Sequence, residues 1–158
     1  MSVEIKDTDH GYKDLVKRVF GAGTKARIDV GILEDGAHGD DAASILEIGT
    51  FNEFGTETIR ERSFIRAWFD EEEPELRIKF AELMKSVVEG KRTKDEILEL
   101  MGLYCVGQIQ KRMADGVPPP NAPSTIKKKG SSTPLIDTGV LRSSISHRVV
   151  EGGGGGEE

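Results

Sequence analysis

The residues best suited to chemistry lie in one acidic loop, EDGAHGDD, at positions 34–41. Four carboxylates and one imidazole stand close together there, and oxygen-rich clusters of this kind can hold Ca²⁺ or Mg²⁺. The members of the cluster are Glu34, Asp35, His38, Asp40 and Asp41. Their spacing follows no known calcium loop, so we expect a solvated acidic loop, with a metal-dependent hydrolase as the weaker alternative.

Nucleophilic catalysis finds no support in the spacing of the remaining reactive residues. His10, His38 and His147 lie in unrelated segments, and none belongs to a G-x-S-x-G or H-E-x-x-H pattern. The single cysteine, Cys105, has apolar neighbours, which indicates a small buried thiol. We therefore expect a protein that is not an enzyme and that holds no cofactor.

Three consecutive lysines, Lys127–Lys129, form the most basic stretch of the chain. Burying them without partners would carry a large desolvation cost, so they should face solvent or a partner. The chain as a whole has a net charge of −6, which argues against a protein whose main role is to hold nucleic acid. A basic arm on an acidic protein is better matched to an acidic neighbouring copy, as in a head-to-tail ring. A nucleic-acid-binding regulator remains the alternative from another class.

A second basic group, Arg60, Arg62 and Arg66, surrounds a short aromatic stretch and could bind phosphate. Glu57 and Glu61 are interleaved with these arginines and would cancel much of their field. Surface ion pairs are therefore the prediction for this segment.

The elements that position these groups begin with a short helix. Apolar residues recur at helical spacing between residues 12 and 20 and predict an amphipathic helix that ends at Gly21. Its apolar stripe consists of Tyr12, Leu15, Val16, Val19 and Phe20. Residues 26–32 alternate in the manner of a half-buried strand, and a further helix is predicted over residues 42–54, closed by Gly55.

The middle of the chain predicts two long helices. After a short helical turn over residues 64–69, capped by Ser63, Pro74 suits the first position of a new helix that ends at Gly90. The carboxylates Asp70–Glu73 and Glu75 would then complement the dipole at a helix start.

The second long helix starts from a capping box, Thr93 with Glu96, and extends to Asp115 before Gly116. Because the turn between the two long helices is short, they should pack as an antiparallel hairpin.

Beyond this hairpin the sequence VPPPNAP fixes φ at four prolines and removes four backbone donors. We predict that residues 118–133 form an extended assembly arm that crosses a neighbouring subunit or another component of an assembly. The arm residues assigned to this contact are Pro118, Pro119, Pro120, Asn121, Pro123, Thr125, Lys127, Lys128 and Lys129.

The segment after the arm should anchor its far end to the home domain. The anchoring residues are Leu135, Ile136, Asp137, Thr138, Gly139, Leu141 and Arg142. The first two would supply an apolar plug, the next two are rival helix caps, the glycine permits a tight approach, and the arginine is free to pair with a carboxylate. The capped helix should include Ile145, and a last strand is expected at His147–Val150.

Length and composition limit the architecture. At 158 residues, with 36% hydrophobic and 6% aromatic content, the chain suits one domain with a lean core. We predict a single α+β domain over residues 1–150, in which helices cover a small antiparallel sheet, and a disordered glycine-rich tail over residues 151–158. No stretch approaches the ~20 apolar residues of a membrane span, so we expect no membrane partner.

Two longer stretches carry a resemblance to a known family. NEFGTETIRERSFIRAWFDE, at residues 52–71, resembles the signature EFGT, a short gap, Ile-Pro-x-Arg-Pro-Phe, Arg and Phe-Asp-Glu. PNAPSTIKKKGSSTPLIDTGVLRSSI, at residues 120–145, resembles a pattern that ends in PLIDTG-x-LR-x-SI. Both are similar to the neck and tail-completion proteins of long-tailed bacteriophages. The matching residues of the first motif are Glu53, Phe54, Gly55, Thr56, Arg62, Phe64 and Arg66; Arg60 and Ser63 stand where the family tends to have prolines.

The resemblance implies a small α+β subunit, with the plan of tail-terminator proteins, that works without catalysis. Such subunits form a hexameric, less often dodecameric, ring between the head-side connector and the tail tube. The implied partners are further copies of the chain, the head-closure proteins and the tail tube or its terminator. The implied location is the virion neck, after assembly in the host cytoplasm, and capping of the tail tube is the alternative role.

Genomic DNA would pass through such a ring without specific binding. Like charge suppresses the counterion release that makes DNA binding tight. We therefore expect carboxylates at the lumen, with Glu34, Asp35, Asp40 and Asp41 as the candidates.

Overall fold

The computed structural model describes residues 11, 13, 14, 17, 26–33, 44–120 and 139–151. Within them the fold is α+β, as predicted. The elements in chain order are β1 (Ala26–Ile32), α2 (Ile45–Phe54), α3 (Arg66–Val88), α4 (Lys94–Asp115), α6 (Val140–Ser143) and β2 (Ile145–Glu151). The acidic loop, the lysine stretch, the glycine-rich tail after residue 151 and most of the predicted first helix lie outside the described residues.

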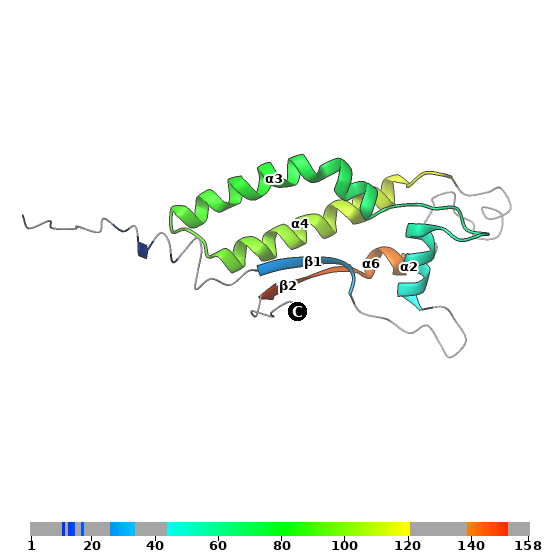
Figure 1. Ribbon diagram of the computed structural model, residues 1–158, viewed down its shortest axis with the longest axis horizontal. Coiled ribbons are helices and arrows are strands. Elements are labelled where there is room, and N and C mark those ends of the chain that lie inside the picture. Colours follow the sequence, from blue (N-terminus) through cyan, green and yellow to red (C-terminus); the bar gives the residue numbers. More distant parts are fainter. Residues whose placement is uncertain are drawn as a thin grey trace, which may run out of the picture.

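Three layers make up the body of the molecule, with α4 between α3 on one side and the two strands on the other (Figure 1). The strands pair antiparallel over their whole length, from Ala26 opposite Glu151 to Ile32 opposite Ile145. Short helices α2 and α6 lie together at one end of this body.

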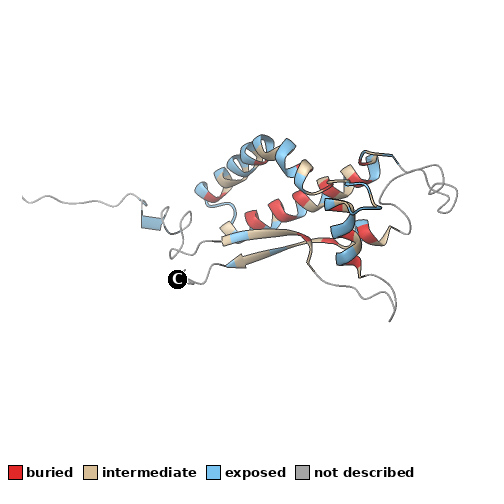
Figure 2. Ribbon diagram, turned by 45° about the vertical axis from the view of Figure 1, so that its right-hand side comes forward, coloured by how far each residue is buried: buried red, intermediate tan, exposed pale blue. Residues whose placement is uncertain are grey.

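The central helix α4 is held in place by buried residues that pack against α3 on one side and against the two strands on the other. Its buried residues are Ile97, Leu98, Met101, Gly102, Cys105, Ile109 and Met113. Figure 2 shows this buried face along α4, whereas most of α3 is exposed on its outer side. Cys105 is 9% exposed, and burial raises the pKa of its thiol, in agreement with the small buried thiol that was predicted.

Gly102 decides how closely the sheet approaches α4. A Cβ atom at this position would overlap the imidazole ring of His147 on β2. The missing side chain therefore lets the ring of His147 lie against the helix, where its Nε2 atom is 2.8 Å from the carboxylate of Glu99.

The predicted capping box of α4 is confirmed. The Thr93 side chain accepts a hydrogen bond from the Glu96 amide, and the Glu96 carboxylate accepts one from the Thr93 amide at 2.7 Å. The antiparallel hairpin is confirmed too, because Glu71 contacts Arg112 while Lys79, further along α3, lies over the ring of Tyr104, further back on α4.

The prediction of a helix break before Pro74 is wrong. Helix α3 runs unbroken from Arg66 to Val88, with Pro74 inside it. A proline at this point removes one backbone hydrogen bond and crowds the preceding turn. Packing of Trp68 and Leu76 on both sides of Pro74 holds the two halves in one helix, which follows an arc over α4 (Figure 1).

As a result, the carboxylates Asp70–Glu73 and Glu75 do not lie at a helix start, and the first turn of α3 has no acidic residue. Two of these carboxylates make ion pairs instead. Glu71 binds Arg112 on α4 through both carboxylate oxygens, and Glu73 binds Arg77 one turn later on α3.

The prediction of a helix that includes Ile145 is also wrong. Helix α6 has only four residues, and Ile145 already belongs to β2, where it is 3% exposed and pairs with Ile32. A β-branched residue that is buried opposite another one favours the strand. Strand β2 is consequently longer than the predicted His147–Val150.

Candidate functional site

Several residues of the motif at residues 52–71 meet around one carboxylate, that of Glu53. This residue is the second last of α2, and only 5% of its surface is exposed. Burying an ionised carboxylate is costly unless it is paired and hydrogen-bonded. Here the compensation comes from the start of α3, which lies next to the end of α2.

Five donors reach the Glu53 carboxylate. The amides of Phe64 and Ile65 donate to Oε2 at 2.8 and 3.1 Å, and Oε1 accepts from the Ser63 hydroxyl at 2.7 Å. The Arg66 amide and Nε atom donate to the same Oε1 at 2.9 and 3.2 Å. Amides at the start of a helix have no partner within the helix and carry the positive end of its dipole, so the anion satisfies both needs.

The acid–base properties of Glu53 follow from these contacts. Burial works to raise its pKa, but hydrogen bonds from the amides of Arg66, Ile65 and Phe64 and from the Ser63 hydroxyl hold the pKa below its ordinary value. Glu53 is therefore a charged anchor that joins α2 to α3.

Arg66 extends this anchor toward the surface. Its guanidinium donates to the main-chain oxygen of Glu53 at 3.0 Å and to the carboxylate of Glu61 at 2.9 Å. It also lies over the ring of Phe54, 4.3 Å from the ring centre, in cation–π geometry. The predicted ion pairing of this arginine is thus confirmed, and phosphate would have to displace two carboxylates to reach it.

Gly55 and Thr56 shape the loop between α2 and α3. Gly55 has a φ of +74°, and a Cβ atom there would lie 3.0 Å from the Glu61 amide nitrogen, so the loop passes too close for a side chain. The Thr56 hydroxyl accepts a hydrogen bond from the Ile59 amide at 2.9 Å. The loop ends at Phe64, whose side chain is fully buried in the core.

Arg62 connects this motif with the arm. Its Nε atom donates to the carbonyl oxygen of Pro119 at 2.9 Å, across 57 residues of sequence. Burial, together with the nearby charge of Arg60, holds the pKa of Arg62 below its ordinary value. The first residues of the predicted arm, Pro118–Pro120, are therefore attached to the motif loop rather than extended away from the domain.

Helix α6, which follows the predicted arm and its anchor segment in the sequence, packs against the domain. Leu141 is buried and packs toward α2, and the Arg142 carbonyl accepts a hydrogen bond from Gln110 of α4 at 3.2 Å. Arg142 itself is exposed and has no ion pair within the described residues. Leu141 thus belongs to the hydrophobic core of the domain, and its role as an anchor of the arm stays a prediction.

Gly139 acts differently from the prediction. No atom lies within 4 Å of a Cβ atom built on it, so there is no tight approach. The glycine occupies the cap position of α6 with a φ of +77°, and this left-handed conformation accounts for it. Neither Asp137 nor Thr138 is assigned as the cap.

Several predicted site residues lie outside the described part of the chain: Asn121, Pro123, Thr125, Lys127, Lys128, Lys129, Leu135, Ile136, Asp137, Thr138, Glu34, Asp35, Asp40 and Asp41. Their contacts remain predictions. In the ranges that are described, no group of three or more His, Cys, Asp or Glu side chains could hold a metal ion. Among the described helices, none is long and apolar enough to cross a membrane.

Two functional contacts were not predicted from the sequence. The sequence does contain an indication of the buried Glu53 carboxylate. Glu53 directly precedes the Phe54-Gly55 pair that ends the helix, and possible donors, Ser63 and Arg66, follow ten and thirteen residues later. The contact between Arg62 and Pro119 could not be predicted, because every residue has a main-chain carbonyl and the amino-acid types do not show which one is the acceptor.

Comparison with known proteins gives no further guide: no family model, no curated protein and no solved structure matches the chain.

Proposed function

We propose that the protein is a non-enzymatic structural subunit of a bacteriophage particle. It assembles as a hexameric ring in the neck, joins the DNA-filled head to the tail and lets the genome pass. The proposal rests first on the resemblance of the two motifs at residues 52–71 and 120–145 to neck and tail-completion proteins.

The observation that carries the proposal furthest is the hydrogen bond between Arg62 and Pro119. It joins the motif at residues 52–71 to Pro119, the residue directly before the motif at residues 120–145. Glu53 fixes the same region, because its carboxylate binds the amide and the Nε atom of Arg66, four residues after Arg62.

The positions of the arm's two ends also support an assembly role. Residues 117–120, α2 and α6 lie at the same end of the molecule (Figure 1). The 18 residues between Pro120 and Gly139 can therefore extend out and return over a distance of about 30 Å, at roughly 3.3 Å per residue in each direction. That reach is sufficient to cross a neighbouring subunit.

The exposed apolar surface points to partners as well. Eight large hydrophobic side chains are at least 38% exposed within the described residues. They are Leu46, Phe51, Phe54, Phe69, Ile78, Phe80, Val88 and Leu103. Adjoining exposed apolar side chains are typical of surfaces that are covered in an assembly, and Phe69 and Phe80 line one groove.

The experiment that tests the proposal removes the gene from the phage that encodes the protein. We expect infected cells to accumulate filled heads and separate tails, seen by electron microscopy, and a supplied intact copy should restore joined particles. Tails of uncontrolled length would instead identify the protein as the tail terminator. Normal infectious particles that lack the protein would refute the proposal.

A further inference from the structure

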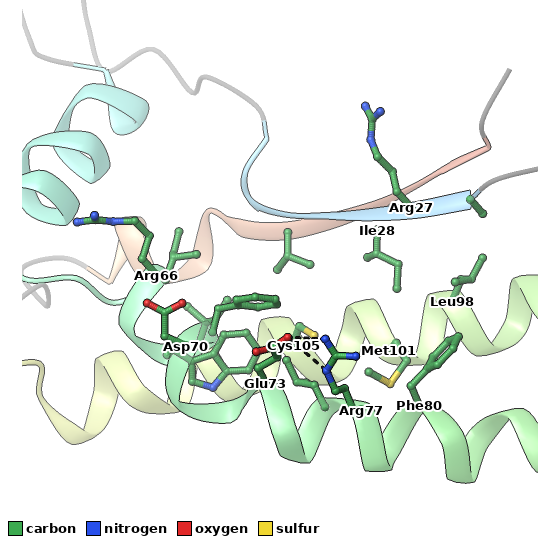
Figure 3. A pocket seen from close by; sticks show the side chains of 17 residues that line it. Arg27, Ile28, Arg66, Asp70, Glu73, Arg77, Phe80, Leu98, Met101 and Cys105 are labelled. Carbon is green, nitrogen blue, oxygen red and sulfur yellow. Dashed lines mark hydrogen bonds and ion pairs between the residues drawn. The ribbon is translucent and has the colours of Figure 1, made fainter. Parts of the chain in front are cut away.

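A long apolar groove runs between α3 and β1, with α4 as its floor (Figure 3). Its volume is about 710 Å³. Ile28 and Val30 line it on the β1 side, Phe69 and Phe80 on the α3 side, and Met101 and Cys105 on the floor. A cavity of this size holds several large side chains, and its two aromatic rims are 51% and 38% exposed in the isolated chain.

The groove has the length of a short helix. Phe69 and Phe80 lie eleven residues apart on α3, which corresponds to about 17 Å at 1.5 Å per residue. The predicted helix at residues 12–20 has nine residues and a length of about 14 Å on the same rise. Its apolar stripe of Tyr12, Leu15, Val16, Val19 and Phe20 fills one side of that helix only.

The described residues of this segment agree with an amphipathic helix. Lys13, Asp14 and Lys17 are helical and exposed, and all three belong to the face opposite the stripe. That polar face also carries Arg18, so it has three cations and one carboxylate. Asp70, at the rim of the groove, has no ion pair within the described residues, which gives a docked cation an available carboxylate.

The described residues of this segment, Lys13, Asp14 and Lys17, do not line the groove of their own chain. They are dark blue in Figure 1 and lie beyond the end of β1 at which the chain enters the strand. Only five residues, 21–25, connect the segment to Ala26, which itself lines the end of the groove. A predicted helix that starts beyond the end of the groove can reach the equivalent groove of an adjoining copy.

We infer that the helix at residues 12–20 of one copy docks its apolar stripe into the groove between α3 and β1 of the next copy. Each copy then contributes a helix on one side and a groove on the other, and such a head-to-tail contact closes into a ring when the rotation between copies permits. The inference deepens the ring proposed above and rests on its self-association, but not on the place of the ring in a virus particle.

The natural cysteine in the floor of the groove provides the test. Val16 lies at the middle of the stripe and Cys105 near the middle of the groove, so a Val16→Cys variant should form a disulfide with Cys105 in either orientation of the helix. A disulfide requires the two Cβ atoms to approach to about 3.5–4.5 Å. Asp14→Cys, on the opposite face of the same helix, is the matched control.

The cross-link is made between two distinguishable chains. A tagged Val16→Cys, Cys105→Ala chain is mixed with the natural chain and oxidised, and the products are separated without reducing agent. We expect a heterodimer of the tagged and natural chains, with at least tenfold less for the Asp14→Cys chain. Absence of the heterodimer would overturn the inference, as would a disulfide formed within one chain in the single Val16→Cys variant, because the helix would then occupy its own groove.

A second measurement avoids disulfide chemistry. Leu15→Asp with Val19→Asp should reduce the native mass of the assembly to that of the monomer, while Lys17→Gln should leave it unchanged. An unchanged mass for the double variant would overturn the inference. The two tests remain distinguishable. Absence of the cross-link refutes the docked helix, whereas joined infectious particles formed without the protein refute only the proposed function, even if the ring forms through this helix.

Discussion

Replacing Glu53 by glutamine tests whether the buried carboxylate is the anchor of the α2–α3 junction. Glutamine keeps the shape and one acceptor oxygen. Placed at the position of Oε2, that oxygen can still accept from the Phe64 and Ile65 amides. The new NH₂ group then faces the amide and Nε atom of Arg66, which are also donors.

The magnitude follows from those two lost contacts. A hydrogen bond to a charged group contributes about 1.5–3 kcal/mol, and a donor left without an acceptor costs about 1–3 kcal/mol. The Arg66 side chain is half exposed and can turn to water and to Glu61, so most of the loss concerns the amide. We expect Glu53→Gln to lower the free energy of unfolding by about 2–3 kcal/mol, and Glu53→Ala by about 3–5 kcal/mol.

The assay is urea unfolding followed by circular dichroism, with Glu61→Gln as the matched control. Glu61 binds the same arginine, but it is exposed, so its loss should cost less than about 1 kcal/mol. Dependence on pH gives an independent check. Because the pKa of Glu53 is lowered in the folded state from its ordinary 4.5, its stabilising effect is complete above that value and is lost as the pH falls through the lowered pKa.

The difference in stability between the natural chain and Glu53→Gln should therefore be constant from pH 7 to about pH 5 and shrink in more acidic solution. A Glu53→Gln chain within 0.5 kcal/mol of the natural one at pH 7 would refute the reasoning. So would a difference that grows below pH 4.5.

Further predictions concern other contacts of the described residues. Gly102→Ala should force the His147 ring away from α4 and lower the free energy of unfolding by about 1–3 kcal/mol. Gly49→Ala should cost less, because the atom that its Cβ would overlap is the terminal methyl group of Ile32, and the contact with Leu141 is an ordinary one; thermal unfolding compares the two variants. Arg62→Ala should release Pro119 and speed protease cleavage between residues 118 and 133, while Arg60→Ala should leave the cleavage rate unchanged. Glu71→Gln should weaken the contact of α3 with Arg112 only slightly, because the carboxylate is exposed; a loss of stability as large as that of Glu53→Gln in urea unfolding would contradict this.

Local signals predicted much of the fold. Strand β1 followed from alternation, and α4 from its capping box and the glycine after it, because these patterns are determined by neighbouring residues. Pro74 misled the prediction because a proline inside a helix is tolerated when packing on both sides exceeds its local cost. Ile145 was misassigned because its strand conformation depends on pairing with Ile32, more than a hundred residues earlier.

For the candidate site the sequence identified the motif residues but not their arrangement. Ser63 and Arg66 could be recognised as helix-start residues, yet the carboxylate that they share comes from the preceding helix. Arg62 was expected to make surface ion pairs, and its hydrogen bond to the main-chain oxygen of Pro119 was not predicted. Contacts of this kind depend on how distant segments approach, which residue types alone do not encode.

The pairing of β1 with β2 has a consequence for biosynthesis. Asp29 on the first strand and Arg148 on the second, whose side chains meet, are 119 positions apart. While the ribosome is still translating, the helical hairpin α3–α4 can already form, but the sheet must wait until residue 151 has left the exit tunnel. A nascent or prematurely terminated polypeptide therefore has no sheet to pack against α4.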